Sequence, residues 1–148
     1  MLTKRLLLLL CPVGAAIVIA SAIAAEPPVP QQDEASKQLE SLLKERRDTL
    51  RQLVTFLDGR LLVGKASKES VIRASNQLLD AELDLARTKA ERIAIHEKLV
   101  DNLRGLEKII ESGAHYGTRQ LDDVFSAKAD RLKAEVQLLR EKIDDKRT

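Results

Sequence analysis

The chain has 148 residues, enough for one domain, and 32% of them are charged whereas 2% are aromatic. Globular cores draw much of their buried area from aromatic rings, so a core of leucine, isoleucine, valine and alanine is more typical of seams between long helices. The 25 lysines and arginines nearly balance the 23 acidic residues, with both signs mixed along the chain. This distribution argues against a nucleic-acid-binding protein, which normally has a basic patch or stripe.

Residues 1–24 have the pattern of a secretory signal peptide. Lys4 and Arg5 make a short positive segment, and residues 6–25 carry no charge. The segment ends in Ala-Ile-Ala, which matches the small-x-small pattern of a cleavage site, so we expect cleavage after Ala24. Such a segment predicts an exported protein of the periplasm or the outer membrane.

Two alternatives remain for this segment. The apolar run is just long enough to span a bilayer, so residues 6–25 would hold the protein at a membrane if they were not cleaved. Lipid attachment through Cys11 is disfavoured, because Leu10 stands where a small residue is required. Cys11 is the only cysteine, so the cleaved chain would have no disulfide. Losing Lys4 and Arg5 would leave equal numbers of basic and acidic residues.

The first helix is expected after a proline-rich linker at residues 25–32. Prolines at 27, 28 and 30 favour an extended conformation there. Residues 33–63 then repeat leucines at steps of three, four and seven, which predicts a helix. Asp33 is its expected N-cap and Gly64 its C-terminal stop.

A second helix is predicted as one continuous element at residues 67–112, with Ser67 as its N-cap. No proline interrupts it. Two adjacent heptad columns run along its length and make a face too wide for one partner helix. One column is Val71, Leu78, Leu85, Leu99 and Leu106, broken by Arg92, and the other is Ile72, Leu79, Ala86, Ile93 and Val100.

A loop at residues 113–117 separates this element from a third predicted helix at residues 118–146. Because both connections are short, consecutive helices must run antiparallel. The predicted fold of residues 33–148 is therefore all-α, with about three helices in elongated, coiled-coil-like antiparallel hairpins. The second helix would extend past both neighbours and leave apolar surface for self-association. A compact three-helix bundle without a partner is the alternative.

The domain repeats itself with a period of 53 residues. Each unit contains the end of one helix, a glycine turn and the start of the next, which indicates a duplicated helical hairpin. The glycines permit positive φ, and the alanines permit close approach of two helices. The matched pairs are Gly64 and Gly117, Val71 and Val124, Ala74 and Ala127, Leu79 and Leu132, Ala81 and Ala134, Glu82 and Glu135, and Leu85 and Leu138.

Residues 60–85 and 116–138, each a glycine turn followed by an apolar-x-x-Ala helix, resemble the helix-start motif of TolC-type outer-membrane efflux proteins. The resemblance covers residues from about 45 to 146. In that family the motif recurs in each half of the chain, and three chains form a channel with a periplasmic barrel of helices and a membrane β-barrel. This chain has no run of alternating β-branched and aromatic residues. The resemblance therefore reaches only the periplasmic helical part, and it implies a role in efflux or transport.

No catalytic, cofactor or metal site is predicted. His96 and Glu97 begin a motif like that of zinc proteases, but Val100 occupies the position of the second histidine, which leaves a surface histidine beside a glutamate. His115 lies in the glycine-flanked loop without the cysteines or clustered carboxylates of a metal site. The sequence also lacks phosphate-binding glycine loops and nucleophile elbows, so we expect no enzymatic activity.

We therefore expect a non-enzymatic envelope protein whose hairpins assemble with themselves, as a homo-oligomer, or with an efflux or secretion apparatus. Partner docking is expected at the hairpin tips, residues 64–67 and 113–118, where Gly64, Gly113 and Gly117 set the turns. A stand-alone periplasmic module that binds client proteins like a chaperone is the alternative. The residues expected in the packing seams are Val71, Ala74, Leu78, Leu79, Ala81, Leu85, Val124, Ala127, Leu132, Ala134 and Leu139.

Overall fold

The computed structural model describes residues 30–143, the first three of them by their backbone alone. The predicted signal segment, residues 25–29 of the predicted linker and residues 144–148 lie outside this range. The described part is all-helical, as predicted, and contains no strand. Its elements are α1 (Pro30–Leu62), α2 (Lys68–Leu83), α3 (Lys89–His115) and α4 (Leu121–Ile143).

The described residues form four helices where three were expected, because the element predicted at 67–112 is divided after Leu83. Thr88 caps the second part. Its side chain accepts a hydrogen bond from the Glu91 N–H at 3.2 Å, and the Glu91 carboxylate accepts one from the Thr88 N–H at 3.0 Å. This reciprocal capping box satisfies backbone donors that a broken helix exposes. The N–H groups of Thr88 and Arg87 also hold the pKa of Glu91 below its ordinary range.

Replacing Thr88 with alanine should lower the free energy of unfolding by about 1 kcal/mol, because a donor at the start of α3 loses its acceptor. Thermal unfolding followed by circular dichroism measures this change. Thr55→Ala is the matched control, since Thr55 lies inside α1 and bonds only the carbonyl of Arg51 in its own helix. Equal melting temperatures for the unchanged chain and Thr88→Ala would contradict the expectation.

Helix starts agree with the sequence at one position and differ at two. Ser67 is the N-cap of α2, as predicted, and accepts a hydrogen bond from the Ser70 N–H at 3.0 Å. α1 begins at Pro30, so Asp33 lies in its first turn and does not cap it. Proline is tolerated there because the first helical N–H groups have no partner within the helix. α4 begins at Leu121, three residues later than expected.

Two glycine turns connect α1 to α2 and α3 to α4 with the same backbone geometry. Gly64 has a φ of 67° and Gly117 a φ of 72°, a conformation that glycine adopts without steric cost. In each turn, the N–H of the glycine donates to the carbonyl three residues back at 3.0 Å, and the next N–H donates to the carbonyl five residues back at 2.8 Å. The two turns are thus 53 residues apart in every bonded position.

Gly113 was expected to set the second turn, but it does not have a positive φ, and only its carbonyl takes part in the turn, by accepting a hydrogen bond from the Thr118 N–H at 2.8 Å. It lies near the end of α3, which continues to His115. An added Cβ at Gly113 would lie 2.7 Å from the Cγ of Arg119, closer than side-chain carbons approach one another. The close passage of the connecting segment therefore accounts for glycine at this position.

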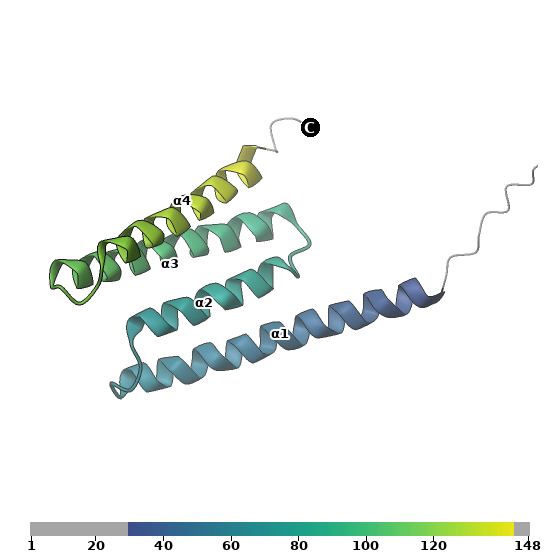
Figure 1. The fold of residues 1–148 in the computed structure, drawn as a ribbon. Coiled ribbons are helices and arrows are strands. Elements are labelled where there is room, and N and C mark those ends of the chain that lie inside the picture. The colour runs from purple at the N-terminus through teal and green to yellow at the C-terminus, as the bar shows by residue number, and fades with distance from the viewer. Residues whose placement is uncertain (1–29, 144–148) are drawn as a thin grey trace, which may run out of the picture.

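Each helix packs only against its neighbours in the chain, within the described residues. Figure 1 shows the four helices in chain order, with consecutive helices running in opposite directions and α1 and α4 at the two edges. Both glycine turns lie at one end, and the turn between α2 and α3 lies at the other. The long central helix that would extend past both neighbours is absent from this array, because the chain folds back after Leu83.

The core of the described residues is thin, and four of its nine buried apolar residues are alanines. None of the larger side chains is completely buried. In an open array, each seam is covered by fewer helices than in a compact bundle. Alanine occupies positions where two helices approach closely. The buried apolar residues are Ala74, Leu79, Ala81, Leu99, Val100, Leu106, Ile110, Ala127 and Ala134.

Candidate interaction surface

The structure divides the predicted seam residues into three groups. Val71, Leu78, Leu85 and Val124 are partly buried. Leu132 and Leu139 are 45% and 57% exposed. The buried members of the set are Ala74, Leu79, Ala81, Ala127 and Ala134.

Apolar side chains remain exposed along both edge helices. On α4 they recur at intervals of three, four and seven residues, so they share one face of the helix. This α4 stripe consists of Leu121, Phe125, Leu132, Val136, Leu139 and Ile143. A second set on α1, the α1 stripe, consists of Leu39, Leu42, Leu53 and Phe56. Uncovered apolar surface of this kind marks sites of association.

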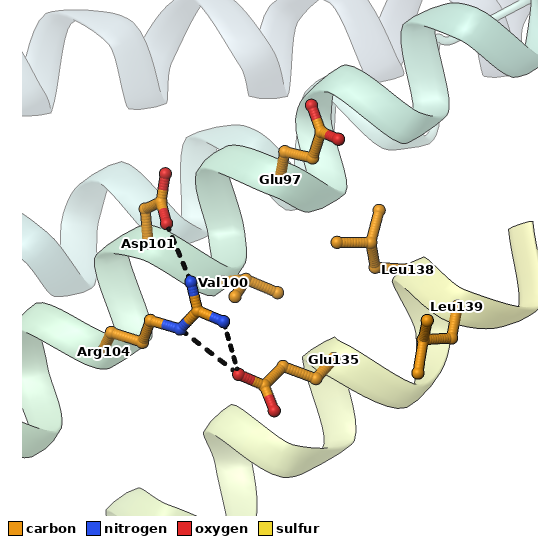
Figure 2. A pocket seen from close by; sticks show the side chains of 7 residues that line it. All are labelled: Glu97, Val100, Asp101, Arg104, Glu135, Leu138 and Leu139. Carbon is orange, nitrogen blue, oxygen red and sulfur yellow. Dashed lines mark hydrogen bonds and ion pairs between the residues drawn. The ribbon is translucent and has the colours of Figure 1, made fainter. Parts of the chain in front are cut away.

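A groove between α3 and α4 lies beside the α4 stripe, since Leu139 belongs to both. Figure 2 shows the Arg104 guanidinium between two carboxylates. It donates hydrogen bonds to Glu135 at 2.9 Å and to Asp101 at 3.4 Å. Glu97, also on this groove, pairs with Lys142 at 2.7 Å. The acidic groups of the groove are therefore occupied by basic groups of the same hairpin.

The carboxylate of Glu135 is held in its ionised form by this arrangement. The hydrogen bond from Arg104, with a further one from Arg131, keeps the pKa of Glu135 below its ordinary range. A general acid needs the opposite shift, toward the working pH. The groups in the groove are thus arranged to join α3 to α4.

The same three-residue ion cluster occurs in both hairpins. In the first, Arg51 of α1 pairs with Glu82 of α2 at 3.1 Å and with Asp48 at 3.6 Å. Arg104, Glu135 and Asp101 occupy the positions 53 residues later. The motif found in the sequence included the two glutamates but missed both arginines and both aspartates, although the same period relates them.

The two glycine turns bring exposed apolar residues to one end of the molecule (Figure 1). Leu62 at the first turn is 88% exposed and Tyr116 at the second is 77% exposed. An ion pair between Glu69 of α2 and Arg119 of the second turn joins the two tips. The expected docking segments, 64–67 and 113–118, therefore lie at the same end of the array.

His96 is buried, so the surface histidine expected at this position is wrong. It is 8% exposed, and its Nδ1 atom has no hydrogen-bond partner among the described residues. Glu97, the next residue, points about 100° further around α3 and is exposed. The burial follows from the fold-back at Leu83, which places both α2 and α4 beside α3.

His96→Leu should raise the free energy of unfolding by about 1 kcal/mol, because an unpaired buried polar atom costs about 1–3 kcal/mol. Chemical denaturation at neutral pH measures the difference. His115→Leu is the control, since His115 is exposed and its replacement leaves the seams unchanged. A loss of stability in His96→Leu would show that the imidazole has a partner that stabilises the fold.

The described residues contain no group of three or more side chains suited to holding a metal ion. None of the helices at 30–143 is long and apolar enough to cross a membrane. Comparisons with family models, with curated proteins and with solved structures find no match for the chain.

Proposed function

We propose that this chain is a non-enzymatic exported envelope protein whose helical hairpins serve as an assembly module. In this role it is similar to the periplasmic helical part of TolC-type efflux proteins, and it is linked to efflux or transport through the complex that it joins. The observation that carries the proposal is the pair of uncovered apolar stripes on α1 and α4. An array with both edges uncovered is suited to association with further helices.

The repeated hairpin supports the resemblance to TolC-type proteins. Both units have a glycine with positive φ at the turn, buried alanines in the second helix, and an arginine–glutamate pair across the two helices. These features set the angle and spacing of a hairpin. The charges of the groove beside the α4 stripe also hold helices together, which favours a packing role over a catalytic one.

Export is tested with the full chain in a bacterial host. Cell fractionation and N-terminal sequencing of the recovered protein are the measurements. We expect the protein in the periplasmic or membrane fraction, beginning at Ala25. Recovery of the unprocessed chain from the cytoplasm alone would overturn the proposal of an envelope protein.

Assembly is tested separately by the mass of the exported protein in light scattering, with circular dichroism on the same sample. We expect a helical oligomer. A helical monomer would favour the second candidate, a stand-alone periplasmic module that binds clients. The exposed tips, with Leu62 and Tyr116, are the observation that favours this candidate. A monomer that suppresses aggregation of other proteins would establish it.

A further inference from the structure

The α4 stripe corresponds by the 53-residue period to a surface that is already covered in the first hairpin. Ile72 of α2 packs against the cluster around Leu106 of α3. Asn76, one turn later, accepts a hydrogen bond from Asn102 of α3 at 2.9 Å. Leu79 follows on the same face and is 8% exposed. One period later, these three positions are Phe125, Ala129 and Leu132 of α4, all of them exposed.

The α1 stripe corresponds in the same way to the opposing surface. Asn102 and Leu106 of α3 face α2. One period earlier, these positions are Thr49 and Leu53 of α1. Phe56 lies one turn beyond Leu53 on the same face and is 59% exposed. The two uncovered edges of the array are therefore the two halves of the α2–α3 interface, repeated once on each outer helix.

We propose that a second copy of this chain covers the α4 stripe with its own α1, in the register that α3 takes on α2. This inference rests on the proposed function as an assembly module and names its partner. The geometry of the internal interface sets the facing residues. Moving the Asn76–Asn102 contact by one period places Ala129 of one copy against Thr49 of the second copy.

This register pairs exposed apolar residues of the two stripes at three positions. In two antiparallel helices, the residue that faces a given position moves back by one residue for each residue moved forward along the first helix. Leu132 then faces Arg46 of the second copy, whose aliphatic stem can cover it. At the positions equivalent to the Asn76–Asn102 contact, an alanine of one copy faces a threonine of the other, and neither side chain is charged. The facing apolar pairs are Phe125 with Leu53, Val136 with Leu42, and Leu139 with Leu39 of the second copy.

One difference from the internal interface follows from side-chain size. An added Cβ at Gly105 of α3 would lie 3.7 Å from Ile72 of α2, which is ordinary contact. The corresponding positions between copies hold Gln52 and Phe125. These side chains are larger, so α1 of the second copy lies farther from α4 than α3 lies from α2.

The contact joins different surfaces of the two copies and is therefore heterologous. Each copy that docks through α1 presents its own α4 stripe to another. Such contacts form closed rings if the rotation between copies closes, and open filaments if it does not. A two-fold dimer, in which α4 meets α4, is not expected.

Cysteine cross-linking in the full chain tests the register, with Cys11→Ser removing the native thiol. The test variant carries Thr49→Cys and Ala129→Cys and is treated with a short thiol-reactive bifunctional reagent. We expect a ladder of covalent multimers on denaturing gels, because each copy links to two others. The variant with Asn76→Cys and Asn102→Cys reports the internal contact. This variant should form a cross-link within one chain, which mass spectrometry of peptides locates. The conditions under which this cross-link forms are then used for the test variant.

Two controls separate this register from random collision. Thr55→Cys with Ala129→Cys places the α1 thiol about 240° further around the helix, and several-fold fewer multimers are expected. Thr49→Cys alone and Ala129→Cys alone should give no multimers, whereas a mixture of the two should stop at dimers. Equal cross-linking of the Thr49 and Thr55 variants, or dimers from either single variant, would overturn the proposed register.

The outcome also separates this inference from the proposed function. An exported oligomer in which only the internal asparagine pair cross-links would exclude this contact between copies and leave the assembly module intact. An exported monomer without multimers would count against both. Multimers of the Thr49 and Ala129 variant in the envelope fraction would support both.

Discussion

Leu79→Asp is expected to unfold the chain, whereas Leu132→Asp is expected to leave it folded and to abolish its self-association. The two leucines occupy the same position in the two repeats. Leu79 is 8% exposed in the interface between α2 and its neighbours, and Leu132 is 45% exposed on the α4 stripe. A carboxylate at Leu79 would be buried without a partner, which costs about 4 kcal/mol or more. The thin core leaves little stability to absorb such a loss.

The measurements are circular dichroism and the mass of each variant in solution. Leu132→Asp should keep its helical circular-dichroism signal and unfold in a cooperative thermal transition, as a folded monomer does. Its mass in solution should fall to that of one chain. Leu138→Asp, in the groove beside the stripe, is a further comparison, because Leu138 is partly buried against α3 and should show a loss of stability. An unchanged oligomer mass in folded Leu132→Asp would remove the α4 stripe from the interface.

The second large effect is expected at the buried alanines. Ala81 is 1% exposed and Ala134, one period later, is 6% exposed. α4 packs only on α3 among the described helices, so Ala134 is buried by that contact. Leucine at either position adds three carbons to a side chain that is already buried between two helices. We expect a loss of about 2–3 kcal/mol in the free energy of unfolding for each variant, because overpacking forces helices apart.

Urea denaturation followed by circular dichroism measures these losses. Ala94→Leu is the matched control, because Ala94 is exposed on α3 and alanine and leucine have similar helix propensities. Similar losses at Ala81 and Ala134 would support equivalent packing in the two hairpins. Unchanged stability of Ala134→Leu would contradict the close approach of α4 to α3.

The helical character, the two glycine turns and the repeat are written in the local sequence, and the sequence alone predicts them. Leucine spacing determines which residues can share a helix face. Ser67 can cap a helix wherever its hydroxyl reaches an N–H three residues on, without any tertiary contact. The ion clusters at Arg51 and Arg104 are also related by the 53-residue period. The sequence alone does not identify them, because they join two helices whose facing sides are known only from the structure.

The break after Leu83 was decided by tertiary structure. Residues 84–88 contain neither proline nor glycine, and both heptad columns continue through them, so a continuous helix also fits the local pattern. The capping box of Thr88 and Glu91 is the local signal that lowers the cost of a break. Folding back then lets α2 bury its second face on α3, which a straight helix in a single chain leaves in water.

The sequence by itself determined which residues are apolar and that they lie in helices, since helical periodicity acts over a few residues. Only the tertiary structure decided which of these residues are covered. Leu79 and Leu132 belong to the same motif, yet the first is 8% exposed and the second, on an edge helix, is 45% exposed. His96 is buried for the same reason, because helices distant in sequence surround it. Burial depends on the neighbours that the whole chain brings to a residue, and an array of four helices has two edges where the intrachain neighbours end.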